Sequence, residues 1–246
     1  MRAGPGLAVV AFVAGFACWC GGAQAYRPFD GTDAAVADTG KIEIELGPAE
    51  YLKQGPERTL FAPSGRFNYG FAPGWEAVVE GRVAHAISGG ARGTSLVGNG
   101  AFLKKLLREG SLQEKTGPSI ATEFGVLLPG IRDDRGTGGS LAGIASQQWE
   151  WGTVHLNAAA SVTRQQHADV FGSIILEGPH AWPVRPVAEL FGERDFGAFT
   201  ARSVLVGAIC QVKDDVAVDL GLRGGRLNNH SSAEIRAGIT FSLAVQ

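Results

Sequence analysis

The sequence predicts an all-β protein, a transmembrane antiparallel up-and-down β-barrel of about 12 strands. Apolar and polar side chains alternate from Ala233 to Leu243. This two-residue period is typical of a strand with one apolar face and one polar face. The same period recurs through a chain of 246 residues that begins with an export signal and contains no long apolar run after it. Such a chain crosses a membrane as strands, because a helical span needs about 20 apolar residues.

The first 25 residues have the pattern of a signal peptide. One positive charge, Arg2, precedes the apolar run Leu7 to Ala17, and the small-residue close Ala23-Gln24-Ala25 follows. This order predicts cleavage before Tyr26 and export to the outer membrane of a Gram-negative bacterium. A lipid anchor is disfavoured, because neither leader cysteine has an aliphatic residue three positions earlier.

Residues 26–40 and 41–246 form the two predicted parts of the mature chain. Residues 26–40 show no clear period and predict a polar, Ala-rich lead-in on the periplasmic side. Residues 41–246 predict one undivided barrel domain, because no Pro/Ser-rich linker, charge block or low-complexity stretch interrupts them.

The composition argues against a nucleic-acid partner and against internal disulfide bonds. The 22 Lys and Arg residues, of which the leader removes Arg2, stand against 24 Asp and Glu residues, so the mature chain is mildly acidic. Without a basic cluster the sequence predicts no nucleic-acid partner. Cleavage also removes two of three cysteines and leaves Cys210, which cannot form an internal disulfide.

Alternating segments place the strands. They are Lys41 to Leu46, Arg66 to Phe71, Trp75 to Val83, Ile120 to Leu128, Leu141 to Trp149, Val154 to Thr163, Val170 to Glu177, Val184 to Glu193, Thr200 to Val212, Val216 to Arg223 and Ala233 to Leu243.

The segment Gly98 to Arg108 is ambiguous, because its leucines also fit a short amphipathic helix. We prefer a strand, since bacterial barrels have an even number of strands and short turns that alternate with long loops. The sequence predicts three long loops, Ile87 to Ser95, Pro129 to Ser140 and Gly224 to Ser232.

Aromatic residues lie close to the predicted turns, at Tyr69, Trp75, Trp149, Trp151 and Trp182. Girdles of aromatic side chains at the two bilayer interfaces have this property. Tryptophans near turns also occur in soluble sandwiches, and a soluble periplasmic β-sandwich is the alternative fold.

If the apolar faces meet lipid, the intervening polar faces line a lumen with an acidic excess. The predicted lumen-lining residues are Glu76, Glu80, Arg82, Glu123, His155, Asn157, Glu189, Glu193, Asp219, Arg223, Glu234 and Arg236. Because a barrel of about 12 strands lies between filled and wide ones, a narrow, partly plugged pore is expected. The alternative for Asp219, Arg223, Glu234 and Arg236, which lie on neighbouring strands, is that they simply pair across the lumen and brace it.

The sequence predicts no catalytic residue, metal or cofactor. His155 with Asn157, and Asn229-His230-Ser231, are the candidates for nucleophilic catalysis, but no serine is tied to the first pair and the second has ordinary loop residues. The five histidines are scattered without metal-ligand spacing, and no phosphate-binding glycine motif follows a strand.

Several short segments resemble a known family. They are Arg27-Pro28-Phe29-Asp30 with Thr32-Asp33-Ala34-Ala35, Phe71-Ala72-Pro73-Gly74-Trp75-Glu76, Ser119 to Gly130, and the closing Glu234 to Phe241. Together they resemble bacterial outer-membrane barrels of the phenol-degradation meta-pathway transporter type. The resemblance implies transport of a small aromatic or other apolar compound.

We therefore expect an outer-membrane barrel for passive transport of a small solute, with the three long loops gating the lumen. The acidic excess is expected to favour neutral or cationic solutes over anions. Outer-membrane lipid, the barrel-assembly machinery and the solute are the expected partners. The alternatives are a plugged structural or interaction barrel without transport and, less favoured, a barrel-borne lipid hydrolase.

Overall fold

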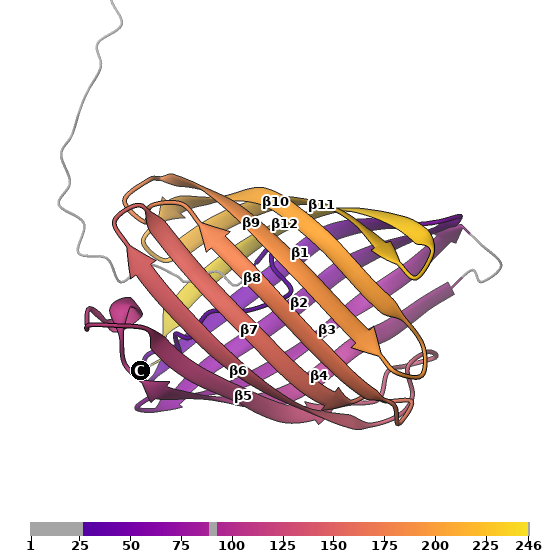
Figure 1. Cartoon of the computed structure of the whole chain (residues 1–246), viewed down its shortest axis with the longest axis horizontal. Coiled ribbons are helices and arrows are strands. Elements are labelled where there is room, and N and C mark those ends of the chain that lie inside the picture. Colours follow the sequence, from indigo (N-terminus) through magenta and orange to yellow (C-terminus); the bar gives the residue numbers. More distant parts are fainter. Residues whose placement is uncertain (1–26, 89–92, 246) are drawn as a thin grey trace, which may run out of the picture.

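The structure, a computed structural model, describes residues 27–88 and 93–245, so the predicted signal peptide lies outside the described residues. Within these residues twelve antiparallel strands form a closed barrel, in which each strand pairs with its neighbours in sequence and the last closes on the first (Figure 1). The strands are β1 (Lys41–Gln54), β2 (Glu57–Ala72), β3 (Trp75–Ser88), β4 (Gly93–Arg108), β5 (Ser119–Leu127), β6 (Gly138–Trp149), β7 (Gly152–Val162), β8 (Ala168–Glu177), β9 (Val184–Asp195), β10 (Thr200–Lys213), β11 (Val216–Leu227) and β12 (His230–Ala244). The predicted all-β barrel class is confirmed.

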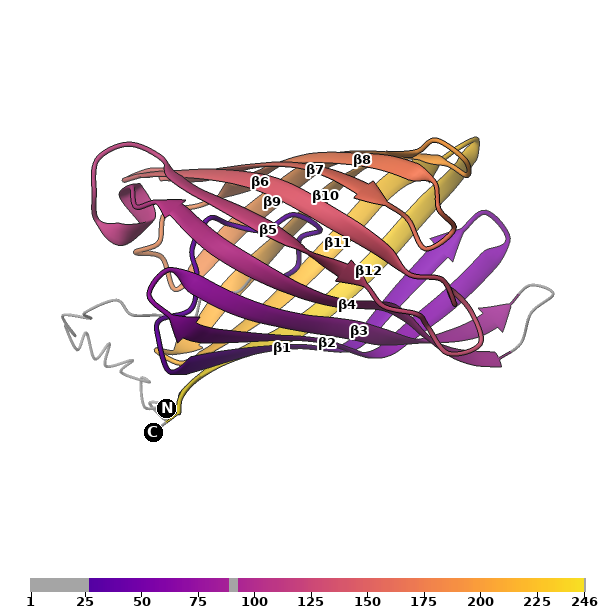
Figure 2. The ribbon, with the colours of Figure 1, turned by 90° about the horizontal axis from the view of Figure 1, so that it is seen from below.

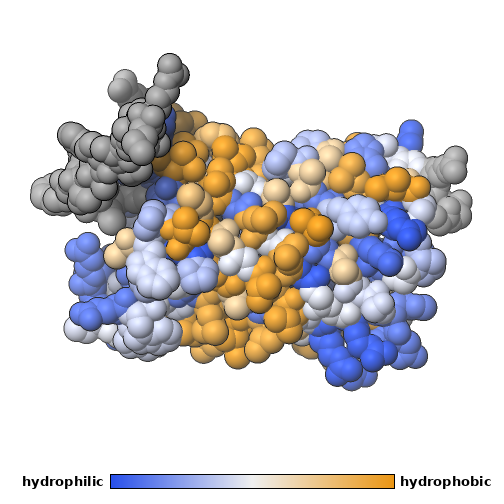
Figure 3. Space-filling model, turned by 90° about the horizontal axis from the view of Figure 1, so that it is seen from above, coloured by the Kyte–Doolittle hydropathy of each residue, from blue (hydrophilic) through white to orange (hydrophobic). Residues whose placement is uncertain are grey.

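The two faces of the wall differ as the alternation predicts. On β11 the side chain of Leu220 is 54% exposed, whereas its neighbour Asp219 is 6% exposed. Figure 3 shows apolar side chains gathered over the middle of one side of the barrel, with hydrophilic ones toward both ends. An apolar band between two polar rims is typical of barrels that cross a bilayer.

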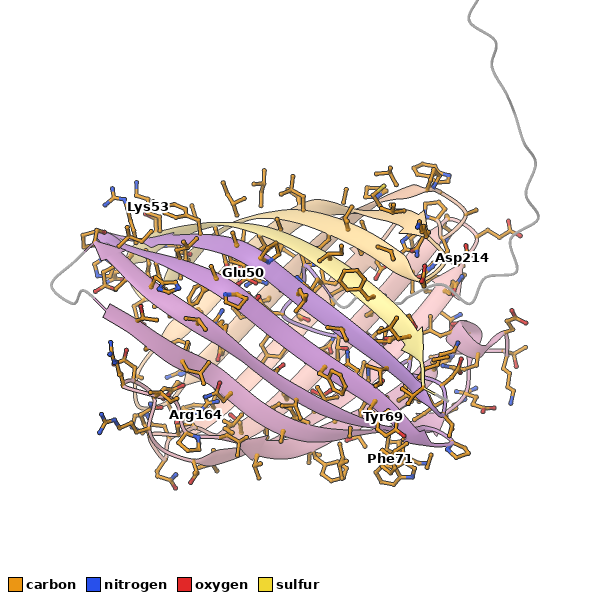
Figure 4. The ribbon with its side chains drawn as sticks, turned by 180° about the vertical axis from the view of Figure 1, so that it is seen from behind. Glu50, Lys53, Tyr69, Phe71, Arg164 and Asp214 are labelled. Atoms are coloured by element: carbon orange, nitrogen blue, oxygen red, sulfur yellow. The ribbon has the colours of Figure 1, made fainter. Side chains whose placement is uncertain are left out.

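Pairing of β1 with β12 closes the sheet, from Lys41 opposite Ala244 to Gln54 opposite Ser232. Closure leaves no exposed strand edge at which other chains could add. A register shift between Leu46 and Ala49 interrupts the alternation, because an extra residue in one strand moves the following side chains to the other face. Glu50, labelled in Figure 4, is therefore buried on the inner side.

The barrel has two ends with different connections. We call the end at which β1 begins and β12 ends the terminal end, and the opposite one the far end (Figures 1 and 2). Connections 73–74, 150–151 and 214–215 at the terminal end are tight, but 109–118, with the short 3-10 helix η1 (Ser111–Gln113), is long. The lengths of the connections therefore do not distinguish one end of the barrel from the other.

The ambiguous segment Gly98 to Arg108 belongs to strand β4, as we preferred. The predicted loop Gly224 to Ser232 is wrong, because β11 extends to Leu227 and β12 begins at His230. Its glycines and serines look like loop residues, but Gly224 and Gly225 pair with Val204 and Ser203 of β10. Among the described residues no helix is long and apolar enough to span a membrane.

Aromatic side chains gather at the terminal end. Trp149 and Trp151 stack with ring centroids 5.2 Å apart beside the β6–β7 turn, and Phe71 lies 6.2 Å from Trp75 beside the β2–β3 turn. Figure 4 shows Phe71 pointing away from the barrel wall. Outward aromatic rings at one rim are what an interfacial girdle requires.

Candidate functional site in a plugged lumen

The chain before β1 enters the barrel. Residues 27–38, which we call the plug, run inside the wall (Figure 2), and Ala34, at 0% exposure, is among their buried residues. This corrects the periplasmic lead-in that the sequence predicts for residues 26–40. The lead-in shows no period because its backbone pairs with side chains of the wall rather than with a neighbouring strand.

Glu189 and Asn157 hold the middle of the plug. The two carboxylate oxygens of Glu189 accept the backbone N–H groups of Asp30 (2.9 Å) and Gly31 (2.8 Å). The amide of Asn157 accepts the N–H of Thr32 (3.1 Å) and donates to the carbonyl of the same residue (2.9 Å). These side chains therefore supply partners that a strand would otherwise give to buried backbone.

Two further wall residues continue this pattern toward β1. The Ser146 hydroxyl accepts the N–H of Ala34 (2.9 Å), and Glu76 accepts the N–H of Ala37 (2.6 Å). Hydrogen bonds from backbone to a carboxylate are among the stronger ones in proteins. The plug is thus attached along its length to β3, β6, β7 and β9.

Ion pairs tie the charged plug residues to the wall. Arg27 lies 2.9 Å from Glu50 and 3.7 Å from Asp219. Asp30 pairs with Arg223 and, at 2.9 Å, with Arg236. Because both partners of each pair are largely removed from water, loss of either one would leave an uncompensated charge.

Deeper contacts add one buried cation and two apolar clusters. The ammonium of Lys104, which is 0% exposed, lies 3.5 Å from Asp33. Phe29 packs against Val187, Ile209 and Ala217, and the buried Ala34 belongs to a second cluster with Ala121 and Ile144. Small residues in the plug let it pass close to the wall.

Glycines in the wall leave space for the plug. A Cβ atom on Gly221 would approach Pro28 to 2.9 Å, and one on Gly70 would collide with the backbone carbonyls of Ala37 and Asp38. The wall and the plug are therefore complementary in shape as well as in charge.

The twelve residues that the sequence places in the lumen all belong to the inner faces of their strands. Six of them contact the plug directly, namely Glu76, Asn157, Glu189, Asp219, Arg223 and Arg236. Of the other six, Glu80 and Glu123 share Arg66, and Arg82 lies 4.1 Å from the ring centre of Phe61. His155 contacts Ser146, and Glu234 pairs with Arg236. Glu193 lines a cavity inside the barrel, toward its far end.

The bracing alternative for the four charged residues holds in part. Glu234 lies 2.9 Å from Arg236 and 3.4 Å from Arg223, so these three brace neighbouring strands. Asp219 faces Arg27 of the plug instead.

Sequence reasoning missed several residues of the site. Arg27, Asp30 and Asp33 follow no strand period, although charges in an otherwise small-residue segment were a usable signal. Lys104 was hidden as well, because the apolar–polar alternation fails around it: Phe102 lies on the inner face and Lys105 on the outer one.

The candidate catalytic groups do not form a reactive site. Nδ1 of His155 lies 2.8 Å from the Ser146 hydroxyl, and Nε2 lies 3.3 Å from Glu177 but has no hydrogen bond of acceptable angle among the described residues. Ser146 is 1% exposed and lies under the plug, whose amide it accepts. A nucleophile needs both an oriented base and room for a substrate. His155 lies in position to act as the base, but Ser146 and His155 are buried and the plug covers the serine, so there is no room for a substrate. His230 and Ser231 are exposed neighbours at the start of β12.

Two cavities flank the plug. The first, of about 290 Å³, runs beside it and is bordered by charged residues that include Arg27, Glu45, Glu80 and Arg82. The second, which we call the outer vestibule, has a volume of about 460 Å³ and opens toward the far end. Within residues 27–88 and 93–245 there is no cluster of three or more side chains that could hold a metal ion.

The outer vestibule combines aromatic rings with paired charges. Phe171, Phe191 and Phe199 line it, and the first two rings lie 5.6 Å apart. The guanidinium of Arg223 lies 5.2 Å from the ring centre of Phe191, and it is neutralised by Asp30 and Glu234. This chamber can hold a small flat solute.

Comparisons with known proteins bear on the fold. No protein-family model matches the chain, and no curated protein matches it. Among solved structures, an outer membrane channel from Pseudomonas putida F1 is similar at a TM-score of 0.59 and 10% identity, with 85% of this chain and 97% of that chain covered. The NanC porin gives 0.57 and 8% (82% and 100% covered), and the KdgM porin gives 0.53 and 13% (82% and 99% covered). The chain therefore has the fold of outer-membrane channel barrels.

Proposed function

We propose that this protein is a channel of a Gram-negative outer membrane that lets a small aromatic or apolar solute pass down its gradient. The observation that carries the proposal is the outer vestibule, a chamber bordered by three phenylalanines and by charged side chains. Its floor is a segment that the wall holds mainly through side chains. Such a segment can leave without breaking the sheet. The printed names of the similar structures, porins and an outer membrane channel, support the same class of function.

The apolar outer surface and the aromatic rim at the terminal end support the placement in a bilayer. Because an exported chain arrives from the periplasm, we assign the terminal end to the periplasm and the far end to the cell exterior. The barrel-assembly machinery and outer-membrane lipid are the partners that this location requires.

The plug, rather than the far-end loops alone, is the proposed gate. Of the three loops expected to gate the lumen, Gly224 to Ser232 is a hairpin, and Pro129 to Ser140 corresponds to connection 128–137 at the far end. The third, Ile87 to Ser95, includes the end of β3 and the start of β4, and its residues 89–92 lie outside the described residues. Carboxylates outnumber cations among the buried side chains of the described residues, which supports a preference for neutral or cationic solutes over anions. The outer vestibule does not add to this preference, because five arginines and three carboxylates border it.

A plugged structural or interaction barrel is the second candidate. It is favoured by the number of hydrogen bonds and ion pairs that hold the plug. The buried and covered Ser146 and His155 give a lipid hydrolase no support, and we propose that the protein is not an enzyme.

Uptake by liposomes separates the two candidates. Liposomes containing the purified barrel should take up a small neutral phenol faster than empty liposomes and faster than a sugar of similar mass. Removal of residues 27–38 should raise the uptake of both solutes. Equal uptake in all vesicles, with a barrel that is folded by its heat-dependent gel mobility, would favour the structural candidate.

A further inference from the structure

Three arginines lie together on the outer face of the barrel near the far end. Arg194, Arg202 and Arg226 belong to the adjacent strands β9, β10 and β11. Arg202 is the direct register partner of Arg226. Arg194 is the register partner of Thr200, which lies two residues before Arg202 on β10. All three side chains are exposed on the face that also carries Leu190 and Val204.

These positive charges lack acidic neighbours. In the part of the chain that the structure describes, no carboxylate lies within 4.0 Å of any of the three guanidinium groups. Among the described residues Arg226 donates to the carbonyl of Asn229 at 3.4 Å, and Arg194 lies 5.0 Å from the ring centre of Phe196. Like charges directly opposite one another on a sheet destabilise it unless an anion compensates them.

An apolar groove begins at two of these arginines. It has a volume of about 770 Å³ and is bordered by Arg202 and Arg226. Its long wall is a row of side chains that are successive register partners across β7 to β10, namely Leu156, Ile174, Leu190 and Val204. Gly172 and Gly192, which also pair with each other, leave the space beside this row without side chains.

We propose that the groove and its arginines bind a phosphorylated lipid of the outer leaflet. Its phosphate lies on Arg202 and Arg226, because guanidinium groups bind phosphate through paired, charge-assisted hydrogen bonds. An acyl chain lies along the aliphatic row, where burial of apolar surface adds to the affinity. Basic sites at a membrane surface recognise lipid head groups in the same way.

The groove itself favours a lipid over the other anionic occupants. A free phosphate ion would leave the aliphatic row exposed. A partner protein would first have to displace the bilayer lipids that already face this part of the wall. The site rests on the proposed outer-membrane orientation, but it does not depend on solute passage.

Native mass spectrometry of the full barrel in detergent can test the site with bis-phosphorylated lipid A and the same lipid after removal of its phosphates. The test variant is Arg202→Gln with Arg226→Gln. The control, Lys105→Gln with Lys213→Gln, removes the same charge from exposed or outward positions near the terminal end. Heat-dependent gel mobility shows that each variant is folded.

The phosphorylated lipid should bind the test variant about tenfold more weakly than the wild type, whereas the control variant should bind it unchanged. The dephosphorylated lipid should bind the wild type about tenfold more weakly, and inorganic phosphate should not displace the bound lipid. Equal losses in both variants, equal binding of both lipids, or displacement by inorganic phosphate alone would each overturn the proposal. Solute uptake is measured separately, so failure of uptake with intact lipid binding contradicts only the proposed function.

Discussion

The lumen around the plug and the outer vestibule differ in chemistry. Around the plug, wall side chains such as Glu189 and Asn157 satisfy backbone groups, and ion pairs such as Arg27 with Glu50 neutralise charged side chains of the plug. In the vestibule, three phenylalanines leave an open space. Because water can replace the polar contacts of the plug, the plug can leave its place in the proposed gating. The phenylalanines of the vestibule can hold an aromatic solute until the plug moves.

Deletion of residues 27–38 should have the largest effect on this comparison. With the signal peptide joined directly to residue 39, the lumen loses its filling and the channel should conduct continuously in planar bilayers. The wild type should conduct only in brief openings. A deletion variant with the same small conductance as the wild type would show that the plug does not close the lumen.

Glu189→Ala should weaken the plug without removing it. The variant loses two hydrogen bonds to a charged acceptor, which together stabilise the closed state by about 3 kcal/mol, so the open fraction should rise about 150-fold. Single-channel recordings measure that fraction.

Glu193→Ala is the matched control for that variant. Glu193 faces the lumen from the same strand, and no hydrogen bond or ion pair joins it to the described plug residues. If both variants raise the open fraction equally, the lumen charge rather than the plug contact is responsible.

Phe191→Ala should have the smallest effect and should act on the other region. Loss of one ring from the vestibule should reduce uptake of a neutral phenol about fivefold, because a solute ring stacked on Phe191 would gain about 1 kcal/mol. Uptake of a small sugar should not change. A variant that also alters the open fraction would show that the vestibule and the plug are not separate regions.

The strands were predictable because successive side chains along the wall alternate between an apolar outer face and a polar inner face, as Leu220 and Asp219 show. Glu50 was not, since the register shift in β1 reverses the alternation before it. The plug was also beyond the pattern, because Gly31 and Thr32 find their partners in side chains more than a hundred residues away. The loop predicted at Gly224 was wrong because its glycine- and serine-rich composition is typical of loops, whereas Gly224 pairs with Val204 of the neighbouring strand.

A reversible covalent lock on the plug tests the central claim most directly. A Cβ atom on Gly31 would meet the Ser173 hydroxyl and, at 2.8 Å, the Asn157 amide. Gly31→Cys with Ser173→Cys, in a Cys210→Ser background, therefore brings two thiols within disulfide reach once the Asn157 side chain shifts, so the reduced double variant is the reference for the oxidised one. The account predicts that openings and phenol uptake vanish under oxidising conditions and return on addition of a reductant. Openings and uptake that persist in the oxidised, cross-linked protein would contradict it.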